Sequence, residues 1–147
     1  MVRVFEGEGQ IADVLLIEDN PADARLATDA LADAKIRVHP VRDGTEALAF
    51  LGRTERYAQA PRPDLILLDL NLPGLDGWDV LVEIKKDRRL RSIPIVILTT
   101  SAEEADVLKS YDLQASCYVT KPVDLDQFRQ AIRDIAYFWL SVARLPS

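Results

Sequence analysis

The sequence predicts an α/β fold in which helices cover both faces of a five-stranded parallel sheet, that is, a doubly wound sheet. Three observations support this prediction. Four short apolar runs, of which Leu65–Leu68 is the most apolar, each end at a polar or charged residue. Segments with apolar residues at helical spacing separate these runs. The length of 147 residues and the hydrophobic content of 48% suit one domain with its own core.

The strands are expected to alternate with helices along the chain. Leu65–Leu68 is apolar on both faces and is therefore expected at the centre of the sheet. Pro40 lacks an amide donor, which confines its strand to an edge. The five strands are predicted at Val14–Ile17, Ile36–Arg42, Leu65–Leu68, Ile95–Leu98 and Cys117–Val119.

A helix is predicted after each strand. The first begins at Asn20-Pro21, where a capping side chain precedes a proline in the first turn, and extends to Lys35. The second follows the Asp43-Gly44 turn. Gly52–Pro63 is a polar connector without periodicity, and Asn71–Gly77 has the composition of a loop. The remaining helices are expected around Val80–Ile84, from about Ala102 to Tyr111, and, as a long last helix, from Asp124.

Charge and composition argue against several classes of function. The net charge of −6 argues against a nucleic-acid-binding surface, and a solvated helix end explains Arg88, Arg89 and Arg91 better. The single cysteine, Cys117, excludes an internal disulfide and a cysteine-based metal cluster. No apolar run reaches the length of a membrane span, so a cytosolic protein without membrane contacts is expected. The predicted organisation is a tail over residues 1–10 and one domain over residues 11–147.

Polar side chains follow or close four of the predicted strands at the same end. They are Glu18, Asp19, Asp69, Thr99 and Lys121. Parallel strands present their carboxyl ends at one edge, where open α/β sheets place their sites, so these groups are expected in one crevice. If one of these carboxylates attacks the phosphorus of a phosphoryl group, it must approach a group that carries about two negative charges. A cation is then needed to offset the repulsion. Mg²⁺ prefers oxygen ligands. The cluster therefore predicts a magnesium site beside a nucleophilic Asp69, with Lys121 and Thr99 as donors to phosphoryl oxygens.

These residues resemble the receiver domains of bacterial response regulators over nearly the whole chain. The resemblance is carried, in order, by Glu18-Asp19-Asn20, Asp69–Pro73, Asp76-Gly77, Thr99 and Lys121-Pro122. It implies a flavodoxin-like strand order, 2-1-3-4-5, and phosphorylation of Asp69 by a histidine kinase. It also implies a further metal ligand at the backbone carbonyl of Asn71. Thr99 and Tyr118 are expected to move together as a switch. The phosphoryl group is expected to be lost slowly, without enzymatic turnover. The chain departs from the family at Thr100, where most receivers have alanine or glycine, so the phosphoryl lifetime is expected to differ.

Three segments narrow the resemblance to the small regulators that pair with bacterial phytochromes: Arg42–Leu48, Lys121–Leu125 and Phe138–Leu140. This resemblance implies a phytochrome-type histidine kinase as the partner. The small, alanine-rich surface of Ala22–Ala30 suits close helix docking by such a kinase. The sequence runs to Ser147 without a DNA-binding or catalytic output domain, so output through protein contacts is expected.

Other interpretations of the same residues remain open. Asp19 could merely cap the first helix, and Lys121 could pair with Asp69 for structural reasons alone. An aspartyl-nucleophile phosphohydrolase of the haloacid-dehalogenase kind would need an acid two residues after the nucleophile, where this chain has Asn71. A flavodoxin-like or nucleotide-binding module would need a glycine-rich loop after the first strand. A phosphate-independent pseudo-receiver is the third alternative.

The last helix predicts a homodimer. One helical stripe suffices to pack this helix on the sheet, and it comprises Phe128, Ile132, Ile135, Ala136 and Trp139. Five further apolar residues fall outside the stripe and need a cover: Tyr137, Phe138, Leu140, Val142 and Leu145. A two-fold contact through the fourth helix, the fifth strand and the fifth helix would supply it. The alternative is that this extension folds back over its own domain.

Overall fold

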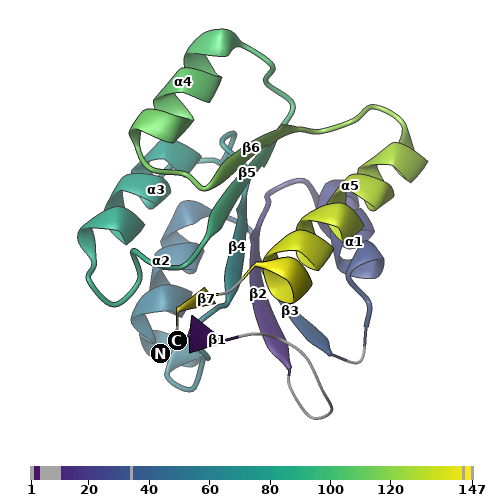
Figure 1. The fold of residues 1–147 in the computed structure, drawn as a ribbon. Coiled ribbons are helices and arrows are strands. Elements are labelled where there is room, and N and C mark those ends of the chain that lie inside the picture. Colours follow the sequence, from purple (N-terminus) through teal and green to yellow (C-terminus); the bar gives the residue numbers. More distant parts are fainter. Residues whose placement is uncertain (1, 4–10, 34, 144, 147) are drawn as a thin grey trace.

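Five parallel strands form the central sheet of the computed structural model, which describes residues 2–3, 11–33, 35–143 and 145–146 (Figure 1). The strands are β2 (Ala12–Ile17), β3 (Ile36–Val41), β4 (Leu65–Leu68), β5 (Ile95–Thr99) and β6 (Cys117–Thr120). Their spatial order is β3-β2-β4-β5-β6. Counted within this sheet alone, the order is 2-1-3-4-5, which confirms the predicted fold. The strand that contains Pro40 lies at an edge, as expected.

Helices cover both faces of the sheet (Figure 1). One face carries α1 (Pro21–Ala30) and α5 (Leu125–Tyr137). The other carries α2 (Gly44–Gly52), α3 (Gly77–Lys86) and α4 (Glu104–Asp112). The connector in which no periodicity was found contains one short 3₁₀ turn, Glu55–Tyr57 (η1).

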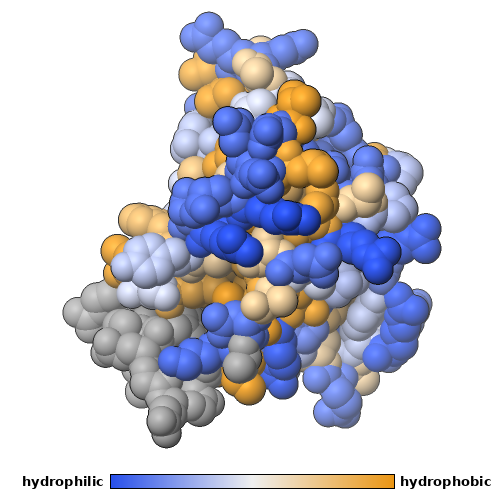
Figure 2. Space-filling model, turned by 90° about the vertical axis from the view of Figure 1, so that its right-hand side faces the viewer, coloured by the Kyte–Doolittle hydropathy of each residue, from blue (hydrophilic) through white to orange (hydrophobic). Residues whose placement is uncertain are grey.

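Two hydrophobic cores result from the alternation of side chains along the strands. Odd-numbered β2 residues such as Leu15 and Ile17 pack with Phe50 of α2 and Leu81 of α3. Even-numbered β2 residues face the other way and join a second core, which includes Val14, Leu16, Ala27, Phe128 and Ile132. Figure 2 views the molecule from the side on which α1 and α5 lie, where hydrophilic side chains cover much of the surface. The apolar stripes of both helices therefore face the sheet.

The strand register brings four strand ends to one edge of the sheet. Ile17 of β2 lies opposite Leu68 of β4, and Thr99 of β5 lies opposite Thr120 of β6. The residues that follow these ends, including Asp69, are therefore neighbours in space although they lie far apart in sequence. The shared edge defines where a site can form.

The C-terminal segment differs from the prediction. After α5 the chain forms a π-helical turn, Phe138–Val142 (η2), and Leu145–Pro146 (β7) then pairs antiparallel with Val2–Arg3 (β1). The predicted tail thus contributes a short strand, and residues 4–10 lie outside the described residues. Among the described residues, no helix has the length and apolar character needed to cross a bilayer.

Five side chains were expected to need burial by a second chain. Two of them are buried within this chain. Leu140 and Leu145 are 4% and 5% exposed and belong to the core beneath α1 and α5. The expectation was wrong for Leu140 because a π-helical turn has more residues per turn, which rotates this side chain inward relative to ordinary helical spacing. It was wrong for Leu145 because this residue lies in β7, where the chain folds back over its own core. Tyr137, Phe138 and Val142 remain exposed, as predicted.

Candidate functional site

The segment after β2 directs two acids toward the shared edge. Asn20 is the N-cap of α1, and its side-chain oxygen accepts hydrogen bonds from the amides of Ala22 and Asp23 at 2.9 and 3.1 Å. The capping role that Asp19 could have played is therefore filled by Asn20. Glu18 is buried, whereas Asp19 is exposed at the edge.

Asp69 is held at the end of β4 by backbone contacts. Its amide donates to the carbonyl of Ile17 at 3.0 Å, and its Oδ1 accepts from the amide of Asn71 at 3.0 Å. These contacts fix Asp69 beside the end of β2 and leave Oδ2 for another partner. The carboxylate is buried.

The ammonium group of Lys121 donates hydrogen bonds to three carboxylates. Its Nζ donates to Oδ2 of Asp69 at 3.0 Å, to Oδ2 of Asp23 at 2.9 Å and to Oε1 of Glu18. Its own amide donates to the carbonyl of Thr99 at 2.7 Å, which ties the start of the loop to the end of β5. The predicted pairing of Lys121 with Asp69 is thus present.

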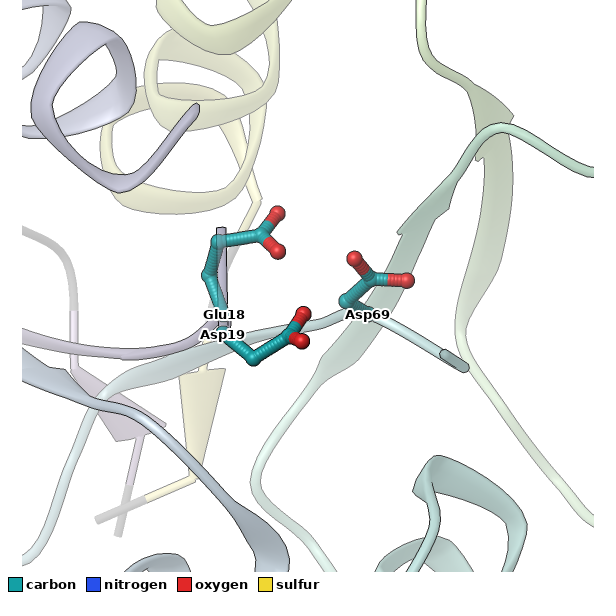
Figure 3. A group of neighbouring side chains, drawn as sticks. All are labelled: Glu18, Asp19 and Asp69. Atoms are coloured by element: carbon teal, nitrogen blue, oxygen red, sulfur yellow. The ribbon is translucent and has the colours of Figure 1, made fainter. Parts of the chain in front are cut away.

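Three acids form a group that suits a divalent cation. Glu18, Asp19 and Asp69 each offer a carboxylate oxygen, and these oxygens all lie within 4.8 Å of one another. Figure 3 shows the side chains of Glu18 and Asp19 directed toward Asp69, which follows the neighbouring strand. Oxygen-only ligands of this kind match a hard cation such as Mg²⁺.

Burial and neighbouring charges shift the pKa values of Glu18 and Lys121. Burial raises the pKa of the Glu18 carboxyl to about 7, the Asp69 carboxylate adds to the rise, and Lys121 opposes it. Burial alone would lower the pKa of the Lys121 ammonium, but its hydrogen bonds to Glu18 and Asp23 and the charge of Asp69 raise that pKa above its usual value. Lys121 therefore stays charged, yet one ammonium does not balance all the acids around it. A bound cation would relieve the remaining negative charge.

An open pocket of about 460 Å³ lies over these groups. Its lining consists of Asp19, Asn20, Pro21, Asp23, Asp69, Asn71, Thr100 and Lys121. Asp69, which is otherwise buried, is thus reachable from solvent through this pocket. Thr100 lies at its wall, as expected for the residue after Thr99.

The two predicted switch residues, Thr99 and Tyr118, are not among the residues that line the pocket. Thr99 is buried, and its Oγ1 accepts a long hydrogen bond, 3.4 Å, from Nδ2 of Asn71. The hydroxyl of Tyr118 donates to the backbone carbonyl of Ser101 at 2.6 Å. Tyr118 therefore contacts the loop that leaves β5, and within the described residues its hydroxyl forms no hydrogen bond with Thr99.

Asp23 belongs to the site but was not predicted. In the sequence it looks like an ordinary acid in the first turn of a helix, where negative charge is favourable. The only available signal was its place in the first turn of the helix that directly follows Glu18 and Asp19. The predicted backbone-carbonyl ligand, Asn71, lines the pocket, and its role toward a metal stays a prediction.

Comparison with known proteins shows similarity to one protein family. A family model described as the response regulator receiver domain matches residues 14–133. Response regulator Rcp1 of Synechocystis sp. is 46% identical over 136 residues, which cover 91% of this chain and 92% of Rcp1.

Solved structures agree with this result. The phosphorylated cyanobacterial phytochrome response regulator RcpA matches with a TM-score of 0.90 and 52% identity, over 93% of this chain and 99% of the RcpA chain. The Mn²⁺-bound form of Rcp1 matches with a TM-score of 0.87 and 44% identity, over 92% of this chain and 99% of that chain.

Proposed function

The chain belongs to the response-regulator receiver family, and from this premise we propose that Asp69 accepts a phosphoryl group. One observation carries the proposal: Oδ2 of Asp69 lies 3.0 Å from the Lys121 ammonium, in a pocket open to solvent. A carboxylate oxygen of Asp69 attacks phosphorus and forms the acyl phosphate. The bond from phosphorus to the donor breaks, and the leaving group keeps the electron pair. The leaving atom is an imidazole nitrogen for a histidine kinase.

Lys121 and Thr99 have supporting roles in this reaction. The Lys121 ammonium donates to a phosphoryl oxygen and offsets the charge that arrives with it. The Thr99 hydroxyl is expected to donate to a second phosphoryl oxygen. Asn71 contacts this hydroxyl only at 3.4 Å, so Thr99 gives up only a weak hydrogen bond when it reorients.

The divalent metal that receiver domains bind is proposed to be Mg²⁺ in this protein. Asp19, Asp69 and Glu18 would hold it, together with the backbone carbonyl of Asn71. When bound, the ion supplies the positive charge that lets a phosphoryl group approach the acids. The proximity of the three carboxylates supports this assignment.

Signalling, and not turnover, is the proposed purpose of the reaction. Asn71 stands where an aspartyl phosphohydrolase needs an acid, so the acyl phosphate has no general base at that position and should persist. We propose that the chain assists its own phosphorylation from small donors and loses the phosphoryl group slowly. The cytosolic location expected from the sequence is part of the same proposal.

The proposed donor is a histidine kinase of the phytochrome type. Support comes from RcpA, which is described as a cyanobacterial phytochrome response regulator and shares 52% identity with this chain. The α1 helix borders the pocket through Pro21 and Asp23, so a kinase that docks on the exposed side of α1 would bring its phosphohistidine to Asp69. The alanine-rich docking surface expected from the sequence is only partly available, because Ala27 and Ala30 are buried in the core beneath α1.

The output is proposed to be a conformational change read by other proteins. Movement of Thr99 toward a phosphoryl oxygen would change the loop that contains Ser101, and the Tyr118 hydroxyl is bonded to that loop. Two positions of Tyr118 would then report the state of Asp69. Identical Thr99 and Tyr118 side-chain positions in resting and phosphorylated structures would contradict this part.

A homodimer is the proposed assembly. Tyr137, Phe138 and Val142 are 67%, 49% and 52% exposed at the end of α5 and in the turn that follows. Leu108 and Tyr111 of α4 are exposed as well. A two-fold contact through α4, β6 and α5 would cover these side chains, since closed two-fold dimers are the commonest assembly and aromatic residues are enriched at interfaces.

Intact mass spectrometry after incubation with acetyl phosphate and Mg²⁺ tests the central proposal. The expected result is one phosphoryl group per chain in the wild type and none in Asp69→Asn. Asp112→Asn removes an acid from the exposed end of α4 and is the matched control, which should be labelled like the wild type. Labelling of Asp69→Asn would place the phosphoryl group elsewhere. Continuous release of phosphate without stoichiometric labelling would favour the phosphohydrolase.

A further inference from the structure

The Lys121 ammonium has no donor left for a phosphoryl group in the resting protein. An ammonium has three N–H donors. In this structure they are matched by three carboxylates, Glu18, Asp23 and Asp69, at hydrogen-bonding distance. A phosphoryl oxygen that is to be stabilised by Lys121 must therefore displace one of these partners.

The three partners differ in how readily they can be displaced. The side chains of Glu18 and Asp69 are 4% and 7% exposed, whereas that of Asp23 is 28% exposed. A buried carboxylate that loses its cation remains uncompensated, which is strongly unfavourable. Asp69 is itself the proposed acceptor. Asp23 is the partner that water can solvate after release.

Asp23 also lies where an incoming donor must pass. It lines the pocket together with Asp69 and Lys121, and it is attached to the first turn of α1. Its amide is fixed by the Asn20 cap at 3.1 Å, so the backbone that carries the carboxylate is well defined. The attachment point of the Asp23 side chain on the pocket wall is therefore fixed.

We propose that Asp23 is a positioning residue that holds the third N–H of Lys121 in the resting protein and gives it up to the phosphoryl group. The inference rests on the proposed phosphorylation of Asp69. Two consequences follow from it. Phosphorylation is slower than the site would otherwise allow, because a hydrogen bond between charged groups must first be exchanged. The pocket also discriminates by charge, since Asp23 repels a dianionic donor more strongly than a monoanionic one.

Two small phosphodonors of different charge test the proposal. At neutral pH acetyl phosphate is a dianion and phosphoramidate is mainly a monoanion. Asp23→Asn keeps the size of the side chain and removes its charge. We expect this variant to be phosphorylated by acetyl phosphate roughly 5- to 20-fold faster than the wild type, and by phosphoramidate only roughly 2- to 5-fold faster. The measurement is the second-order rate of mass increase at fixed Mg²⁺ and ionic strength.

Two further variants separate this role from a purely structural one. Asp23→Glu retains the charge and should keep the wild-type ratio of the two donor rates. Asp29→Asn removes one negative charge from the exposed end of the same helix, away from the pocket, and should leave both rates within about twofold of the wild type. Circular dichroism of all variants verifies that α1 is intact.

The possible outcomes are distinguishable. A wild-type protein that neither donor labels would refute phosphorylation of Asp69 itself. If the wild type is labelled, equal donor ratios in wild type and Asp23→Asn would overturn only the role of Asp23. Slower phosphorylation of Asp23→Asn by both donors would also overturn it, because Asp23 would then assist Lys121 and not compete with the phosphoryl group.

Discussion

A Cβ atom on Gly77 would lie 2.5 Å from the backbone carbonyl oxygen of Asp69. Glycine at this position lets the first turn of α3 pack directly against the backbone of the proposed phosphoacceptor. The helix start is fixed there by a capping box between Asp76 and Asp79. The position of Asp69 therefore depends on α3 as well as on β4.

Gly77→Ala is expected to destabilise the fold and to displace Asp69. The added methyl group meets backbone atoms of Asp69 and Leu70, which cannot move aside as a flexible side chain could. Overpacking of this kind costs about 1–3 kcal/mol of unfolding free energy. Urea denaturation should show the loss, and phosphorylation should slow in parallel. Gly52→Ala is the matched control, because its Cβ would meet only a side-chain atom at 3.7 Å, so the change should be neutral or stabilising.

Asp19→Asn is expected to weaken divalent-metal binding. Asp19 offers one of three carboxylate oxygens that lie within 4.8 Å of one another, and the amide would supply an oxygen without the charge. A loss of tenfold or more in Mg²⁺ affinity, about 1.4 kcal/mol or more, should appear in calorimetric titration. Lys121→Ala should still bind Mg²⁺ but fail to produce the phosphorylation response. Equal affinity in Asp19→Asn and wild type would contradict the assignment.

Thr100→Ala is expected to shorten the lifetime of the phosphorylated protein. Thr100 is exposed at the wall of the pocket, so its side chain limits the approach of water to Asp69. Removing the methyl and hydroxyl groups should speed dephosphorylation by severalfold, measured from the decay of the phosphorylated mass after removal of the donor. Thr54→Ala, at an exposed position beyond the C-terminal end of α2, should leave the decay unchanged.

The sheet and most of the site could be predicted because they depend on strand periodicity. A strand that is apolar on both faces must lie between covered faces, and parallel strands must end at one edge. These two rules place Asp69, Thr99 and Lys121 together without any knowledge of their distances. The start of β2 was less predictable, since Asp13 interrupts its apolar run. That carboxylate is buried in β2 because Arg37 on the neighbouring strand pairs with it at 3.0 Å.

The features that could not be predicted depend on rotation about a helix axis. Whether Asp23 points at Lys121 or at solvent depends on the phase of α1, which the Asn20 cap sets. Likewise, the inward rotation of Leu140 depends on a π-helical turn that hydrophobic spacing does not reveal. Each of these details is decided by a single turn of helix, where periodicity carries no information.

Phe138→Asp is expected to dissociate the proposed homodimer. Half of the Phe138 side chain is exposed, and its ring packs edge-on against Trp139 at 5.2 Å between ring centroids. A carboxylate there would have to be desolvated in a two-fold contact, while the monomer would keep it in water. Light scattering at micromolar concentration should give a dimer for the wild type and a monomer for the variant. Leu140→Ala provides the contrast, because Leu140 is buried within its own chain: it should lower the unfolding free energy by about 2–5 kcal/mol. A wild-type protein that is monomeric in both resting and phosphorylated states would refute the dimer.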